Sequence, residues 1–252
     1  MSLSKPYHRI WRPILGYELF SFNDKEDKIT LDYLSDDKFA NQAEIKDLLT
    51  YTNLLIRDLY EIFNYIDPDD RNLNVFSHRL YEIFVRACTE IESSFKGIFS
   101  SKGYTPSRYN MEEYFKIGKL TKLNEYTIEF SKWNSDHIFQ PFKEWSSTSY
   151  QPISWYQAYN QVKHNRHRNI KLANLENVMN AVSGLLCLLH SQIGGNVLEV
   201  CFEGLYPAQT KEEKAYNSTF TLIPPFFSDQ DKYKFIWNKI KDDPDSVESY
   251  SF

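Results

Sequence analysis

Six consecutive positions near the middle of the chain hold a dense set of cationic and titratable side chains. These side chains belong to Lys163, His164, Arg166, His167 and Arg168. An imidazole can transfer a proton near neutral pH, and Lys and Arg side chains bind phosphate oxygens. The set therefore suits phosphate binding, or phosphodiester cleavage by proton transfer. Because the whole chain carries a formal net charge of −5, we expect a local basic patch rather than nucleic-acid binding by whole-molecule charge.

The helix that must position this patch precedes it. If that helix runs through His164, then Tyr156, Asn160 and His164 share one face at four-residue steps, with Lys163 and His167 beside them. Such a face could form a phosphate-binding cleft across a dimer axis and read backbone charge rather than bases. A purely structural role is also open, because polar side chains cap helix ends and cations complement the C-terminal helix dipole.

A metal site at this junction is not expected. His164 and His167 are three positions apart, which can place two ligands on one helix face, but a site needs a third and usually a fourth ligand. No other His, Cys or clustered carboxylate lies nearby in the sequence. The chain also lacks a glycine-rich phosphate loop, a metalloprotease His pair and a hydrolase serine motif. We predict no metal and no cofactor.

The cysteines and the apolar runs indicate the compartment. Cys88, Cys187 and Cys201 are odd in number and widely spaced, as is typical of reduced cytosolic thiols. Cys88 and Cys187 fall in apolar helical regions, where Cys usually packs as a small hydrophobe. The longest apolar run, 181–189, is too short to span a bilayer. We therefore expect a soluble cytoplasmic protein with no membrane partner.

Periodicity predicts the elements that carry these residues. Apolar side chains recur at helical spacing in five segments, 44–62, 74–101, 109–120, 154–163 and 172–193, the last ending at Gly194. Alternation predicts a strand within 125–133, and strands or an extended arm at 197–206 and 218–227. The carboxylates of 67–70 are expected in a solvated loop. The last ten residues are rich in Asp, Glu and Ser and are expected to fray.

Together these patterns predict a mainly α protein with a bundle of about four main helices and small β elements. The expected regions are an N-terminal mixed extension at 1–43, a helical core at 44–195 with a β-containing insertion at about 121–150, and a C-terminal extended arm at 196–252. Aromatic residues make up 16% of the chain and are expected in the core and at contact surfaces. Three of them in the insertion, Trp133, Phe142 and Trp145, could line a small-molecule pocket.

Two stretches of the sequence resemble the HEPN superfamily. They are RACTEIESSFKGIF at 86–99, with Glu90 and Glu92 before Lys96, and AYNQVKHNRHRNIKLANLENVMNAVSGLLCLL at 158–189. The resemblance implies a HEPN-like all-α unit that commonly forms homodimers. Many members of the superfamily are metal-independent RNases in toxin–antitoxin, phage-defence and RNA-processing systems, and others are catalytically inactive binding modules.

The resemblance also implies site residues. Active members carry an Arg, then a polar residue that is often Asn, then a His; in the short form the Arg lies five positions before the His. In this chain that frame gives Tyr159, Asn160 and His164, so Asn160 and His164 are the candidate catalytic residues. Tyr159 departs from the motif, because a neutral phenol cannot make the bidentate phosphate contact of Arg. A neighbouring cation of the junction would have to replace it.

A rival match to a longer form of the motif occurs between the first two predicted helices. Arg71, Asn72 and His78 fit its spacing, but they precede the wrong helix for the resemblance. We interpret this stretch as a loop followed by a helix start.

Three functions remain open from the sequence. The first is a HEPN-like interaction or RNA- or phosphate-binding module, homodimeric, catalytically degenerate and linked to stress or phage defence. The second is a metal-independent endoribonuclease that uses His164 with a displaced Lys or Arg. The third is small-molecule binding between the helices and the insertion. The Tyr159 departure favours the first, with RNA or a nucleotide phosphate and a second copy of the chain as the expected partners.

Overall fold

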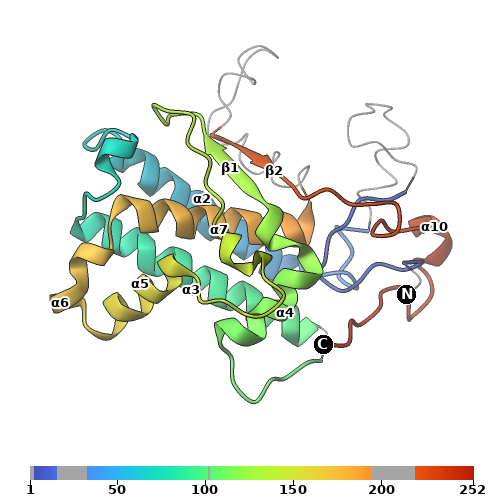
Figure 1. Cartoon of the computed structure of the whole chain (residues 1–252). Coiled ribbons are helices and arrows are strands. Elements are labelled where there is room, and N and C mark those ends of the chain that lie inside the picture. The colour runs from blue at the N-terminus through green and yellow to red at the C-terminus, as the bar shows by residue number, and fades with distance from the viewer. Residues whose placement is uncertain (1–2, 16–32, 102, 195–218) are drawn as a thin grey trace, which may run out of the picture.

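The computed structural model of the chain describes residues 3–15, 33–101, 103–194 and 219–252. Within them the protein is mostly helical and has one small two-stranded sheet (Figure 1). The helices are α2 (Gln42–Ile62), α3 (His78–Ser101), α4 (Met111–Thr121), α5 (Ser154–His164), α6 (Arg166–Asn169), α7 (Leu175–Ile193) and α10 (Trp237–Ile240). The strands are β1 (Thr127–Phe130) and β2 (Phe220–Ile223). The prediction of a mainly α protein is confirmed.

Helix α7 forms the centre of the core. Its residues are buried without interruption from Ala181 to Ile193. A helix that is buried on all sides must be surrounded by other elements, and α7 packs chiefly against α3 and also contacts α5 and β1 (Figure 1). The helix predicted over 172–193 is therefore the one on which the others assemble.

Asparagine side chains fix the start of three helices. Asn41, Asn110 and Asn174 accept hydrogen bonds from the backbone N–H three residues further on, at 3.2, 2.9 and 3.0 Å. Each bond satisfies a donor that the first turn of a helix leaves free. At the other end of α7, Gly194 has a φ of +75°, and a Cβ there would lie 2.5 Å from Nε1 of Trp11. Only glycine fits both the conformation and the space.

Helix α3 begins later than its apolar pattern predicts. The side chain of Ser77 accepts the backbone N–H of Leu80 at 3.1 Å, and the helix starts at His78 rather than near residue 74. The residues before Ser77 pair instead with the chain leading into α7, where Leu175 donates its N–H to the carbonyl of Val75 at 2.9 Å. Long-range backbone pairing therefore displaces the first predicted turn.

The two strands join the insertion to the C-terminal segment. β1 and β2 are antiparallel, with Thr127 opposite Ile223 and Phe130 opposite Phe220. The predicted alternation is confirmed: Ile128 and Phe130 are buried, and Glu129, between them, is exposed. The stretch predicted as a strand or arm at 197–206 lies outside the described residues.

The C-terminal end packs on the body of the protein, so the prediction that it frays is wrong. The ring of Phe252 lies 4.9 Å from that of Phe99 on α3, and the ring of Tyr250 lies 5.3 Å from that of Tyr7. The acidic and serine side chains suggested solvation, but these two rings supply apolar area that is covered by the fold.

One hydrophobic core contains residues from all three predicted regions. It includes Ile10 of the N-terminal extension, Trp145 of the insertion and Tyr233 of the C-terminal arm. The Tyr233 hydroxyl donates to the carbonyl of Ile10 at 2.8 Å, which ties the two end segments together. Among the helices of the described segments, none has both the length and the apolar character to cross a membrane.

Candidate functional site

Residues 163–168, which hold the predicted cationic side chains, lie at a sharp turn between α5 and α6. Asn165 separates the two helices, and its side chain accepts the backbone N–H of Arg168 at 3.3 Å. The side-chain amide of Asn169 donates to the carbonyl of Gln161 at 2.9 Å, near the end of α5. These bonds satisfy backbone groups that helix ends leave open. Two asparagines, and not the charged residues, therefore hold the turn.

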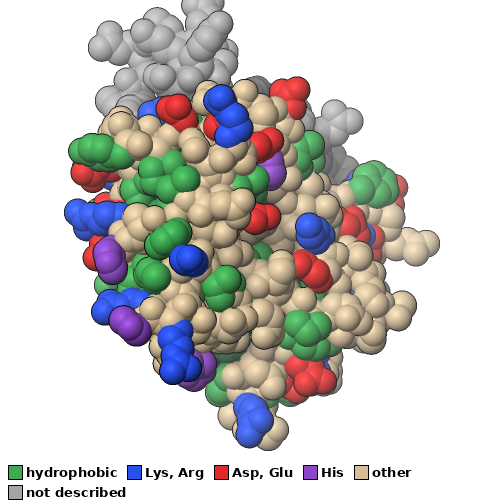
Figure 2. Space-filling view, turned by 60° about the vertical axis from the view of Figure 1, so that its left-hand side comes forward, with side chains coloured by type: hydrophobic (Ala, Val, Ile, Leu, Met, Phe, Trp, Pro, Cys, Tyr) green, Lys and Arg blue, Asp and Glu red, His purple; other side chains and the backbone are tan. Residues whose placement is uncertain are grey.

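The predicted phosphate-binding side chains lie on the surface of this turn. His164, Arg166, His167 and Arg168 are all exposed, and none of these four forms an ion pair with a residue that the structure describes. Figure 2 shows Lys, Arg and His side chains gathered toward the left of the displayed face, the side on which α5 and α6 lie in Figure 1. The structure thus brings the predicted cationic residues together on one exposed surface.

The start of α3 adjoins the junction. The guanidinium of Arg166 lies 5.4 Å from the ring centroid of Tyr81, in the first turn of α3. This cation–π contact orients Arg166 without neutralising its charge. His78, the first residue of α3, is exposed. The surface formed by His164, Arg166, His167, Arg168 and their neighbour Lys163 is called the basic junction below.

Beneath the basic junction, α5 is joined to α3 by a polar network. The hydroxyl of Tyr156 donates to Glu92 Oε1 at 2.8 Å, and Lys163 Nζ lies 3.6 Å from the same oxygen. Burial, and then the bond to Glu92, raise the pKa of Tyr156 above its ordinary value. Hydrogen bonding to Tyr159 and the charge of Glu92 raise the pKa of Lys163. Lys163 therefore stays protonated at neutral pH, which suits anion binding and not general-base catalysis.

The residue at the family's Arg position faces the core. Tyr159 is 1% exposed, and its ring packs at 6.0 Å from that of Phe84 and at 5.4 Å from that of Tyr156. Asn160 is half-buried and His164 is exposed. The face predicted to hold Tyr156, Asn160 and His164 together is therefore divided between core and surface. The exposed part can bind a phosphate, but no cation occupies the Arg position of the motif.

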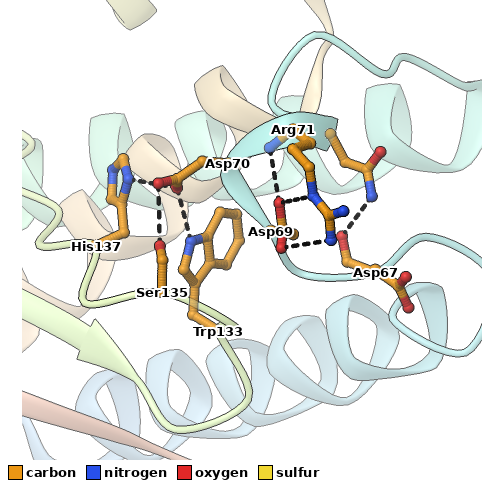
Figure 3. Close-up of polar contacts among 8 residues, drawn as sticks. Asp67, Asp69, Asp70, Arg71, Trp133, Ser135 and His137 are labelled. Atoms are coloured by element: carbon orange, nitrogen blue, oxygen red, sulfur yellow. Dashed lines mark hydrogen bonds and ion pairs between the residues drawn. The ribbon is translucent and has the colours of Figure 1, made fainter.

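In the rival match, the side chains of Arg71 and Asn72 form hydrogen bonds within their own loop (Figure 3). Arg71 donates to both carboxylate oxygens of Asp69, from Nε at 2.8 Å and from Nη2 at 3.0 Å. The side-chain amide of Asn72 donates to the carbonyl of Asp67 at 3.0 Å. These bonds shape the loop before α3, which supports its interpretation as a structural element.

A second cluster, which the sequence did not predict, is centred on Asp70 (Figure 3). Its carboxylate accepts from Trp133 Nε1 at 2.9 Å and from Ser135 Oγ at 3.0 Å, and lies 2.7 Å from His137 Nδ1. Serine and histidine each contact the carboxylate rather than each other, so this is not a nucleophilic triad. It clamps the α2–α3 loop to the segment after β1. The expected solvated loop is confirmed in that Asp67 and Asp70 are exposed, but the sequence did not predict the partners of Asp70, which lie more than sixty residues away along the chain.

The clamp should make stability depend on pH. Hydrogen bonds, first that of Trp133, lower the pKa of Asp70. A carboxylate with a lowered pKa stabilises the folded state above its unfolded pKa of about 3.9, and this contribution is lost as the pH falls through the folded pKa. We expect Asp70→Asn to flatten the fall in the urea midpoint between about pH 5 and about pH 2, followed by tryptophan fluorescence. Asp242→Asn, at an exposed carboxylate, is the control. Identical pH profiles for Asp70→Asn and the wild type would contradict the clamp.

The other chemical candidates are buried. Phe142 and Trp145 are fully buried, with ring centroids 5.0 Å apart, and Trp133 is 7% exposed, so all three rings pack in the core. Burial raises the pKa of the Cys88 and Cys187 thiols, which disfavours the nucleophilic thiolate. Cys201 lies outside the described residues.

No group of His, Cys, Asp and Glu side chains suited to holding a metal ion occurs within residues 3–15, 33–101, 103–194 and 219–252. No protein-family model, curated protein or solved structure matches this chain.

Proposed function

We propose that the protein binds the sugar–phosphate backbone of single-stranded RNA through the basic junction. One observation carries this proposal. In a chain with a formal net charge of −5, the cations Arg166 and Arg168 are exposed on one turn, with His164 and His167 between and beside them and no carboxylate paired to them from the described residues. Cations left unpaired in an acidic protein attract polyanions locally.

The surroundings of the patch favour a single strand over a duplex. Tyr81 contacts Arg166, and Phe76, five residues before Tyr81 in the chain, is 43% exposed. Single-stranded nucleic acids are commonly bound by cations that follow the backbone together with aromatic rings on which bases stack. Contacts of this kind read backbone charge and stacking, so little sequence preference is expected.

The proposed function does not include catalysis. The HEPN resemblance supports an RNA ligand, but Tyr159 is buried against Phe84 and supplies no charge to stabilise the phosphate in a transition state. The endoribonuclease alternative uses exposed His164 with a displaced cation. Incubation of labelled RNA with the protein and EDTA should leave the RNA intact. Cleavage that His164→Ala abolishes would establish the alternative.

The binding test measures fluorescence anisotropy of a labelled oligouridine at several salt concentrations. Charge reversal in Arg166→Glu/Arg168→Glu is expected to weaken binding about tenfold or more. A plot of log affinity against log salt has a negative slope, and each lost phosphate contact reduces its magnitude by about 0.7 for single strands. The loss of two contacts should therefore make the slope shallower by about 1.4.

The matched control is Lys46→Glu/Lys239→Glu, which changes the net charge by the same amount at exposed sites on α2 and α10. Its affinity and salt slope should stay close to those of the wild type. Equal losses in the two double variants would assign binding to overall charge and refute a site at the junction.

A further inference from the structure

A second candidate site lies away from the basic junction, toward the other end of α3. A cavity of about 840 Å³ is lined by residues of α2, α3 and the segments before α2, together with Tyr109 before α4. The stripe of α3 that lines it includes Glu90, Ser94, Gly97 and Ser101, which recur at three- and four-residue steps and so share one helix face. A volume of this size is typical of sites for small ligands.

Arg9 is a buried cation in the cavity wall. It is 4% exposed and lies flat on Gly97, where an added Cβ would be 2.3 Å from Nη1. Nε donates to Gln192 at 2.6 Å and Nη1 donates to Glu44 at 3.0 Å. A guanidinium has five N–H donors, so three remain without an acceptor in the part of the chain that the structure describes. A desolvated cation with spare donors favours an anionic group of a ligand.

Two further groups that line the cavity form no hydrogen bond or ion pair with a described residue. Ser94 lines the cavity and is 1% exposed, and its hydroxyl has no hydrogen-bond partner among the described residues. Glu90, one helical turn earlier, is half-buried and forms no ion pair with any described residue. Burial raises the pKa of Glu90 above its ordinary value, and the charge of Arg86 offsets this only in part. A bound ammonium would relieve this cost of desolvation.

The charges of the whole lining are nearly balanced. Within the described residues, three Lys or Arg and four Asp or Glu side chains line the cavity. Such a wall repels a polyanion such as RNA and gives a simple polycation no strong attraction, because each would meet like charges. A ligand that carries one group of each sign matches it best.

The distance between Arg9, which suits an anionic group, and Glu90, which suits an ammonium, sets the length of a ligand that contacts both. Glu90 and Gly97, against which Arg9 lies, are seven residues apart on α3, which corresponds to about 10 Å at the rise of an α-helix. An extended peptide of three residues spans about 10 Å. The hydroxyl of Ser93, which lines the cavity between Glu90 and Gly97, can hydrogen-bond an amide group of the peptide.

We propose that this cavity binds a short peptide of about three residues as a zwitterion, with its carboxylate at Arg9 and Ser94 and its ammonium at Glu90. The site is separate from the basic junction, so either proposal can fail without the other.

Calorimetric titration of the full chain with triglycine tests the proposal. Triglycine should bind about tenfold or more tightly than N-acetyltriglycine, which lacks the ammonium, and than triglycine amide, which lacks the carboxylate, because each loses a charge-assisted hydrogen bond. Glu90→Gln should abolish the discrimination against N-acetyltriglycine and keep that against triglycine amide. Lys46→Gln, on α2 but outside the cavity lining, should change neither ratio.

The comparison of capped and uncapped peptides needs only the wild-type protein, so it does not depend on how a variant folds. No binding of triglycine, or equal binding of the three peptides, would overturn the proposal. Tighter binding of 1,4-diaminobutane or inorganic phosphate than of triglycine would also overturn it, by showing a site for one charge only.

Discussion

Tyr159→Arg, which restores the residue type of the family motif, is expected to destabilise the protein by about 2–4 kcal/mol and to produce no RNase activity. Tyr159 is 1% exposed and its ring packs on Phe84 and Tyr156. An arginine there would place a charge in the core and beside Lys163, whose ammonium lies 5.0 Å from the Tyr159 ring centroid. The charge repulsion and the lost packing both lower the free energy of unfolding.

Urea unfolding followed by tryptophan fluorescence measures this loss, and metal-free RNA cleavage is assayed on the same preparation. Tyr159→Phe keeps the ring and should lose about 1 kcal/mol or less, since it removes only the hydroxyl near Lys163. A stable Tyr159→Arg variant that cleaves RNA would show that position 159 faces a catalytic site, and would contradict the core position of this side chain.

Trp145→Ala should cost about 3–5 kcal/mol, the range for deleting a large buried aromatic side chain. Trp145 is fully buried, and its ring contacts those of Phe95, Phe115 and Phe142 at centroid distances of 6.2, 5.7 and 5.0 Å. Gly118 of α4 lies directly under it, because a Cβ at Gly118 would be 2.4 Å from the indole. Removing the ring would leave a cavity between α3, α4 and the insertion.

The free energy of unfolding, measured in urea, distinguishes a core position from a ligand pocket. Tyr65→Ala is the matched control, because Tyr65 is 83% exposed and its loss should change stability by no more than about 0.5 kcal/mol. If Trp145→Ala were as mild as Tyr65→Ala, the indole would not be a packing residue, and the small-molecule pocket expected from Trp133, Phe142 and Trp145 would regain support.

The two proposed sites depend on the same helix in different ways. The first turn of α3 supports Arg166 through Tyr81, while the turns from Glu90 onward line the cavity with Arg9. Because α3 packs along buried α7, both sites are placed on a rigid element, which favours precise positioning of binding groups.

Local periodicity determined the helices and the strand. The three- and four-residue steps of α7 and the alternation of β1 predict which side chains are buried, because the direction of each side chain follows from its position in the element. The basic junction was also predictable, because its residues are adjacent in the sequence and a turn rich in Asn, Lys and Arg stays on the surface. What it binds stays a proposal.

Contacts between distant segments could be found only in the tertiary structure. Asp70 meets His137 and Arg9 meets Gln192, across 67 and 183 positions of the chain, and no local pattern encodes such pairs. From the sequence, Tyr250 and Phe252 belong to a polar tail. In the fold their rings contact those of Tyr7 and Phe99. The sequence by itself determined which segments are helical and where positive charge is concentrated. Tertiary packing decided that Tyr159 faces the core, that Asp70 is a clamp and that a charged cavity is lined by α2 and α3, because burial and long-range pairing arise only when separate elements share one core.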